Sequence, residues 1–274
     1  VNAPLVFSLT RPGQIATLTF DGTAGQLLQF SQSNRTLSPN GTQFEFVPVR
    51  PDGTCLLSAD CAPWRKNAND IVSFPPLPQD GRYQIRVRLW NTGAHSGTGS
   101  ASLVLSEDVA GTLGIDAPYT QVQSALYGQR HRLAFDAEAG DSLGLGVTSV
   151  VTSPTERNLE IEVFRPSGTL HRAASCGSSS VQDKCAAVLR NLPETGTYTV
   201  LVRPRDTQAL TYSGRIWLSR ELVQNLPIGA PTVLAIPRPG QIATLSFDGA
   251  AGQRLRLAAS GFSTSPANAH FAFV

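Results

Sequence analysis

The residues whose types and spacing most clearly suggest a chemical role are four cysteines, which occur as two pairs. Cys55 and Cys61 follow one Gly-Thr turn, and Cys176 and Cys185 follow the corresponding turn of a second copy. Two thiols in one short loop can close a disulfide or contribute to a zinc site, but the chain has no Cys-x-x-Cys and no neighbouring pair of histidines. We therefore predict two local disulfides, Cys55–Cys61 and Cys176–Cys185, and an oxidising compartment. A disulfide that closes a loop this short should stabilise the folded state by about 2–3 kcal/mol.

The four histidines do not form a recognisable catalytic pattern. His95, His131, His171 and His270 occupy different positions in the repeated segments described below. A nucleophilic triad needs a Ser or Cys, a His and an acid that converge, and the chain has no Gly-x-Ser-x-Gly turn. It also has no phosphate-binding loop, dinucleotide fingerprint or His-Glu-x-x-His. We therefore expect no catalytic, cofactor-binding or metal-binding residues, and a protein that is not an enzyme.

Three tryptophans offer the alternative of a sugar-stacking face. Trp64 lies beside the first cysteine loop, where exposure is possible, whereas Trp217 lies in an alternating segment and is expected in the core. Trp90 matches neither of them across the repeats. A carbohydrate-binding face therefore remains an alternative that the sequence does not favour.

A long internal repeat organises these residues. The segment at residues 11–22 returns 227 residues later, at 238–249, with one Thr replaced by Ser, and a weaker copy occupies 128–136. Self-similarity at a fixed period indicates an array of structural units. Because the first and third copies resemble each other most, we interpret the chain as an alternating A-B-A array, although recent duplication alone would leave the same pattern.

The repeat continues through most of each copy. Residues 44–54 match 159–169 and residues 77–87 match 192–202, both at an offset of 115. The third copy stops at Val274, which corresponds to Val47, so we expect an incomplete third unit. The predicted domains are residues 1–108 (repeat A), 109–221 (repeat B) and 222–274 (the start of a further repeat A).

Period-two alternation predicts strands throughout the copies. Tyr83, Ile85 and Val87 alternate with polar residues, as in a strand with one buried face. Asp-Gly and Thr-Gly pairs separate the segments, and no window has a sustained helical period. We predict an all-β chain of tandem, jelly-roll-like β-sandwiches. Three leucines should occupy equivalent core sites, namely Leu28, Leu143 and Leu255.

Composition limits the possible partners. The chain has 274 residues and a formal net charge of +2, which gives no electrostatic case for nucleic acid or an anionic membrane. No apolar run approaches the roughly 20 residues that span a bilayer. The chain has no methionine, so we expect a processed or internal fragment of a longer protein.

Three short motifs recur at turns and strand edges of the first two copies, at 24–26, 50–54 and 81–87 and again at 139–141, 165–169 and 196–202. Their order resembles the bacterial pre-peptidase C-terminal (PPC) domain, a secreted β-sandwich module. The resemblance implies a module that flanks secreted hydrolases or recurs in surface proteins, and some members bind calcium through acidic loop residues. Here Asp52 becomes Ser167 in the second copy, and the recurring Phe-Asp-Gly aspartate is more simply a turn former.

Two classes of function follow from these observations. The first is a structural segment of an extracellular bacterial fibre, sheath or surface stalk, whose partners are further copies of itself. In a stronger form, the third unit is completed by a strand from another subunit. The second is a non-catalytic accessory module of a secreted enzyme or adhesin, which binds a surface glycan or a protein. A repeated, exposed aromatic cluster would favour the second class, and end-to-end contacts between units would favour the first.

Overall fold

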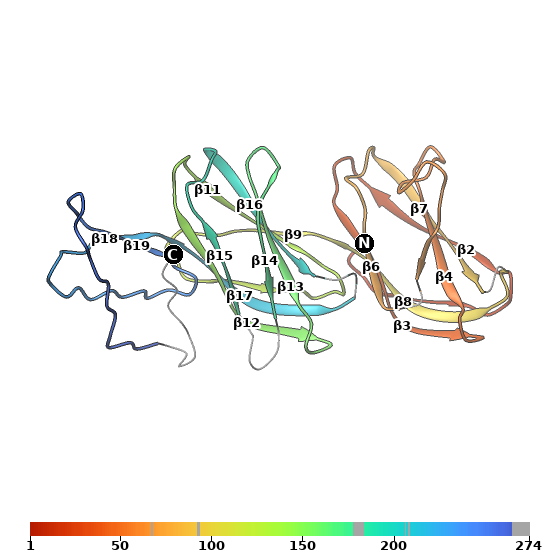
Figure 1. Ribbon diagram of the computed structural model, residues 1–274. Helices are drawn as coiled ribbons and strands as arrows, with labels where there is room; N and C mark the ends of the chain where they lie inside the picture. Colours follow the sequence, from red (N-terminus) through yellow and green to blue (C-terminus); the bar gives the residue numbers. More distant parts are fainter. Residues whose placement is uncertain (67, 92–93, 178–183, 206, 208, 265–274) are drawn as a thin grey trace. The chain divides into compact units, whose positions relative to one another are not determined.

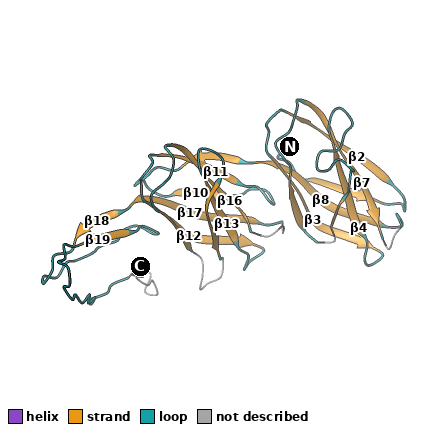
Figure 2. Cartoon of the chain, turned by 45° about the horizontal axis from the view of Figure 1, so that its top comes forward, coloured by secondary structure: helices purple, strands orange, loops and turns teal. Residues whose placement is uncertain are grey.

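The computed structural model describes residues 1–264 except 67, 92–93, 178–183, 206 and 208. The described residues contain strands, turns and loops but no helix (Figure 2), as predicted, and thus no helix that could cross a membrane. The chain forms two compact units, Val1–Leu222 with Ala235–Ala243, and Val223–Leu234 with Thr244–Val274. The first unit contains two β-sandwiches.

The first sandwich has two four-stranded antiparallel sheets in the described residues, with orders β1-β8-β3-β6 and β2-β7-β4-β5 (Figure 1). Side chains from both sheets fill one core, in which Phe30 of β3 meets Phe46 of β4 at a ring distance of 4.9 Å. The strands are β1 (Leu5–Leu9), β2 (Ile15–Gly22), β3 (Leu28–Ser38), β4 (Gln43–Val49), β5 (Trp64–Lys66), β6 (Asp70–Ser73), β7 (Gly81–Trp90) and β8 (Thr98–Glu107).

The second sandwich repeats this plan. Its sheets have the orders β10-β17-β12-β15 and β14-β13-β16-β11-β9 in the described residues, and β9 pairs with β11 in parallel. The strands are β9 (Val109–Thr112), β10 (Thr120–Gln123), β11 (His131–Ala137), β12 (Leu143–Ser153), β13 (Leu159–Phe164), β14 (Leu170–Cys176), β15 (Cys185–Leu189), β16 (Gly196–Pro204) and β17 (Thr211–Arg220).

The predicted alternation is present in both cores. Tyr83 and Tyr198, at equivalent positions of β7 and β16, are fully buried, and each hydroxyl donates to a backbone carbonyl four residues earlier, at 2.8 and 2.9 Å. Leu28 and Leu143 are also fully buried at equivalent positions of β3 and β12. The two sandwiches therefore bury the same residue types in the same register.

The third copy does not follow this plan. It contributes β18 (Leu222–Asn225) and β19 (Ala243–Ser246), which pair only with each other in the described residues. Leu255 is 46% exposed and lies outside any strand, so its predicted core site is wrong. A strand buries a leucine only where a second layer covers it, and the described part of this copy has no such layer. The end of the third copy, residues 265–274, lies outside the described residues.

Candidate functional site: a docking surface between repeats

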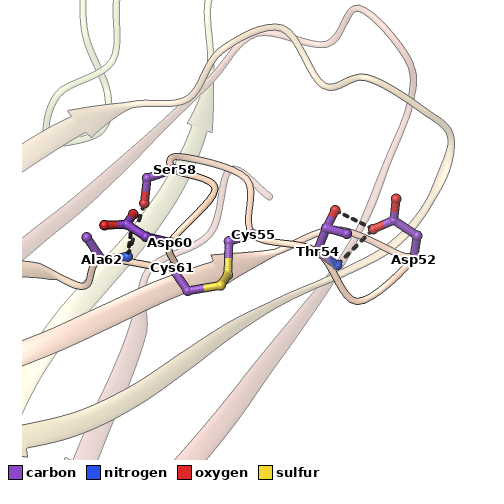
Figure 3. Close-up of a disulfide and its surroundings, with 7 residues drawn as sticks. All are labelled: Asp52, Thr54, Cys55, Ser58, Asp60, Cys61 and Ala62. Atoms are coloured by element: carbon purple, nitrogen blue, oxygen red, sulfur yellow. Dashed lines mark hydrogen bonds between the residues drawn. A yellow bond between two sulfur atoms is a disulfide. The ribbon is translucent and has the colours of Figure 1, made fainter.

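The structure joins both cysteine pairs within their own sandwiches. Cys55 and Cys61 are linked with their Cα atoms 5.3 Å apart (Figure 3), and Cys176 and Cys185 are linked at 4.9 Å. Asp60 accepts hydrogen bonds from the Ser58 hydroxyl and the backbone after the disulfide, and these bonds lower the pKa of its carboxyl. The first disulfide therefore closes a loop that is also fixed by side-chain hydrogen bonds.

Peptide mapping under non-reducing conditions should find each cysteine linked only to its partner in the same sandwich. The expected species are Cys55–Cys61 and Cys176–Cys185, because the Cα distances already suit a disulfide. A peptide that links the two sandwiches, or a thiol that reacts with an alkylating reagent before reduction, would contradict the assignment.

The recurring aspartate that follows Phe20 and Phe135 is not a turn former in either complete sandwich. In the first sandwich Asp21 lies inside β2, and in the second Asp136 lies inside β11, where it accepts a hydrogen bond from the Thr197 hydroxyl at 2.6 Å. Asp52, in contrast, does form a turn, because it accepts from both the N–H and the hydroxyl of Thr54. These two hydrogen bonds lower the pKa of the Asp52 carboxyl.

The described histidines lie in three separate environments. His131 is buried against the hydroxyl of Tyr212 at 2.9 Å, and His171 lies near the ring of Tyr198. His95 lies 3.9 Å from Glu45, a fully buried carboxylate. That carboxylate is bound by two arginines, Arg65 and Arg88. His270 lies outside the described residues. Within the described residues, no group of three or more His, Cys, Asp and Glu side chains could hold a metal ion.

His131 should make the second sandwich less stable in mild acid. Burial lowers the pKa of His131 below its ordinary value of 6.5, so the unfolded chain takes up a proton that the folded chain resists. The free energy of unfolding is therefore expected to fall as the pH drops below about 6.5. The slope should correspond to the uptake of at most one proton on unfolding. Urea unfolding at pH 7.5 and 5.5 measures this loss. His131→Gln should reduce it, and an equal loss in both proteins would contradict the assignment.

The tryptophans do not form one exposed face. Trp64 is half-buried and packs on Phe30 and Phe46 at ring distances of 5.7 and 5.3 Å, and the Arg65 guanidinium lies over Trp90. Trp217 is also half-buried, but on the outer face of the β10-β17-β12-β15 sheet, so its predicted place in the core is wrong. The physical reason is the alternation of side chains along a strand. Ile216 and Leu218 point into the core, so Trp217 between them must face outward.

On the outer face around Trp217, strand β12 exposes backbone without side chains. On β12, Leu143 and Leu145 point into the core, and the alternating residues Gly144 and Gly146 face outward. Gly144 pairs with Ser219 of β17, and Gly146 pairs with Trp217. The face therefore offers bare backbone beside one hydroxyl and one indole. We call Gly144, Gly146, Trp217 and Ser219 the glycine face.

A loop of the third copy occupies the glycine face within the same compact unit. A Cβ added to Gly144 would lie 2.1 Å from the carbonyl oxygen of Gly240, and one added to Gly146 would lie 2.2 Å from that of Pro239. Such distances are impossible for a real side chain, so glycine is required at both positions. This is the close approach of another backbone that glycine in a strand permits.

Arg238 holds the loop in place. Its Nε donates to the Ser219 hydroxyl at 2.6 Å, a terminal nitrogen donates to the Ala117 carbonyl, and its guanidinium lies 5.3 Å from the Trp217 ring. Gln241 adds a bond from Nε2 to the Arg220 carbonyl at 3.0 Å. Arginine suits this position because a planar cation can stack on an indole and donate several hydrogen bonds together.

The aromatic stack extends along the face. The Tyr119 ring lies 5.3 Å from that of Trp217, and the Arg215 guanidinium lies 4.7 Å from the Tyr119 ring. The Trp217 indole N–H donates to the Thr148 hydroxyl at 3.3 Å, which fixes the ring plane. Trp217 is therefore oriented to receive Arg238 and is not available as a flat sugar-binding platform.

The sequence contained a signal for the glycine face that the strand pattern alone did not use. Gly144 and Gly146 alternate with two core leucines, and paired glycines on one face of a strand indicate a close backbone approach. The partners of Arg238 were not predictable, because Ala117 and Ser219 are distant in the sequence and meet only in the folded chain.

Comparisons with known proteins give distant likenesses only. No family model matches the chain, and no curated protein matches it. The periplasmic g-type lysozyme inhibitor PliG of Aeromonas hydrophila matches 40% of this chain and 98% of its own, at 16% identity and a TM-score of 0.26. The glycosylasparaginase PNGase F of Flavobacterium meningosepticum covers 80% of this chain and 96% of its own, at 8% identity and a TM-score of 0.25.

A third likeness is to the PBSX exported protein XepA, which covers 80% of this chain and 87% of its own at 10% identity and a TM-score of 0.25. TM-scores this far below 0.5 are too low to transfer a fold or an activity. Within this chain, the two disulfides fit a secreted module.

Proposed function

We propose that this chain is a non-catalytic structural segment of an extracellular bacterial fibre, sheath or surface stalk, built from tandem β-sandwich repeats of PPC type. The observation that carries the proposal is the seating of loop 238–241 on the glycine face, where Arg238 contacts three groups of the preceding sandwich. When a repeat binds the next one through a dedicated loop, that contact fixes where the two repeats join. A flexible linker between independent binding modules needs no such contact.

The link between the first two sandwiches supports the same proposal. Asp108, at the end of the first, accepts hydrogen bonds from Arg130 and Arg132 of the second at 2.7 Å each. The side chains of Asp108 and Arg130 are 6% and 10% exposed, so this ion pair is largely removed from water. The backbone also continues directly from β8 into β9, which pairs with β11. Both connections therefore have specific polar contacts.

Immunogold electron microscopy of the intact source cells tests the proposal. Antibodies raised against the folded chain should label filaments, a sheath or surface projections at regular intervals. Gold confined to soluble secreted protein, with no labelled assembly, would contradict a structural role. Binding of the purified chain to a glycan array in that case would support the accessory-module alternative.

A further inference from the structure

The loop that fills the glycine face has a second copy at the start of the chain. Residues 11–14 and 238–241 share the sequence Arg-Pro-Gly-Gln and the same turn. Gly13 and Gly240 have φ angles of 73° and 72°, and in each loop the Gln N–H donates to the Arg carbonyl at 3.2 Å. We call residues 11–14 the first loop and residues 238–241 the third loop.

The corresponding loop of the second sandwich, residues 126–129, has the same turn. Gly128 has a φ of 75°, and the Gln129 N–H donates to the Leu126 carbonyl at 3.3 Å. In both sandwiches the loop glycine N–H also donates to a carbonyl of its own repeat: Gly13 to His95 at 2.7 Å, and Gly128 to Leu210 at 3.1 Å. The loops are therefore held in one conformation by their own sandwiches, which lowers the entropy cost of docking.

The three loops differ in what lies against them. Gly240 lies on Gly146, and a Cβ on Gly128 would lie 2.9 Å from the Ile71 side chain of β6. Each of these two loops thus rests on a sheet of the sandwich that precedes it in the chain, the third loop on the inner strand β12 and the loop of the second sandwich on the edge strand β6. Residues 11–15, in contrast, are exposed, and Ile15 is 65% exposed. The first loop has the shape of a docking loop, and in the described residues no second-type sandwich lies against it.

Gln14 shows the undocked arrangement of the same residue as Gln241. The Gln14 Oε1 accepts hydrogen bonds from the N–H groups of Thr10 and Arg11 at 2.9 and 3.2 Å, so its amide is folded back on its own loop. The Gln241 amide instead reaches the Arg220 carbonyl of the preceding sandwich. One sequence therefore occurs here in both a free and a docked form.

The face that fits the first loop is the glycine face and not the corresponding face of the first sandwich. Register places Gln29 and Ser31 of β3 where Gly144 and Gly146 lie in β12, and Val104 where Trp217 lies. Side chains at these two positions would occupy the space that the Pro239 and Gly240 backbone takes. An Arg-Pro-Gly-Gln loop thus requires a sandwich of the second type.

We propose that the first loop is a docking element whose partner is the glycine face of a second-type sandwich carried by another copy of this repeat pair. The proposal rests on the proposed function, because it names the contact that would extend the array. The contact is heterologous, since a loop of one unit enters a different surface of the next, and such contacts build open-ended chains.

The test uses a receiver variant of the full chain, Arg238→Ala with Gly240→Val, in which the third loop cannot fill its face. Valine at position 240 would place its Cβ 2.4 Å from the Gly146 Cα, at a φ that disfavours a branched side chain. The probe is the first loop of neighbouring molecules of the same variant. The readout is the Trp217 indole N–H signal in a proton–nitrogen NMR spectrum, with the Trp64 and Trp90 signals as controls for folding.

In dilute receiver the Trp217 signal should be displaced from its wild-type position. From about 10 µM to about 1 mM it should return toward that position, and sedimentation should show a rising average mass. The wild-type chain should stay monomeric, because the tethered third loop has a high effective concentration. Adding Arg11→Ala should abolish the return, whereas Arg86→Ala, at an exposed arginine of β7, should leave it intact.

Two results would overturn the inference: a Trp217 signal in the receiver that does not depend on concentration, or a return that persists with Arg11→Ala. Neither result would remove the proposed function, because the cell labelling and the seating of the third loop within one chain are measured separately. Conversely, a positive result with unlabelled cells would keep the docking contact and remove the fibre.

Discussion

Leu143→Ala should lower the free energy of unfolding of the second sandwich by about 2–5 kcal/mol. Leu143 is fully buried on β12, which pairs with both β15 and β17, so its neighbours are held by hydrogen bonds on two sides. A site framed in this way collapses poorly after truncation, and the cavity cost adds to the lost burial of the side chain. The loss should place this variant among the least stable single substitutions in the chain.

Two leucine or valine truncations serve as matched controls. Val151 lies on the same strand but is 59% exposed, and Leu255 aligns with Leu143 in the sequence repeat but is 46% exposed. Each alanine variant should change the unfolding free energy by less than about 0.5 kcal/mol, as surface substitutions do. Urea titration followed by fluorescence and circular dichroism measures all three. A Leu143→Ala effect within that small range would refute the proposed register of β12.

The residues that sequence reasoning placed correctly are those whose position depends on local alternation. Leu28 and Leu143 are buried because period-two patterning fixes which side of a strand faces the core, whatever the strand pairs with. The same rule, applied more strictly, would have corrected Trp217: its neighbours Ile216 and Leu218 are in the core, so it must face outward. For Trp217, the position in the strand alternation predicts burial better than the size and apolar character of the side chain.

Leu255 shows where alternation is insufficient. Its local sequence matches that of Leu28, yet it is exposed, because burial also requires a second layer that the sequence around it does not encode. The contacts of Arg238 are beyond prediction for a related reason. Its two hydrogen-bond partners come from opposite ends of the second copy, and only the folded sandwich brings them to one side of Trp217. Contacts between residues far apart in the sequence therefore determine both the exposure of Leu255 and the partners of Arg238.

The alternation of the repeats has a structural explanation in the outer faces. The second sandwich has glycines at positions 144 and 146, and the loop placed on them carries Arg, Pro and Gly. The first sandwich has Gln29 and Ser31 at these positions, and the loop of the second copy rests nearby on Ile71. Each type of face therefore accepts a different loop, which would keep an A-B-A order in register.

Gly146→Ala should separate the stability of the second sandwich from the docking of the third loop. The added Cβ would lie 2.2 Å from the Pro239 carbonyl oxygen and 2.8 Å from the Gly240 nitrogen. Both atoms belong to backbone, so the loop must move by more than an ångström. That displacement is incompatible with the 2.6 Å bond between Arg238 and Ser219. The loop should therefore leave the face.

The sandwich itself should not lose stability. Gly146 has no left-handed φ, so alanine fits its backbone, and glycine replacement at a compatible site stabilises a protein by about 0.4–1 kcal/mol through the unfolded chain. Hydrogen exchange with mass spectrometry should show at least ~10-fold faster exchange in a peptide covering residues 238–243, including the Gln241 amide that bonds to Arg238. The melting temperature should hold or rise.

Gly214→Ala is the matched control, since it removes a glycine from β17 of the same sheet. A Cβ at position 214 would have its nearest neighbours at 3.8 Å, which is ordinary contact, and none of them belongs to the third loop. This variant should leave exchange in residues 238–243 unchanged. If both variants release the loop, the effect comes from general loosening of the sheet. If neither does, the glycine face is not what holds the third loop on the second sandwich, and the structural basis for an array is lost.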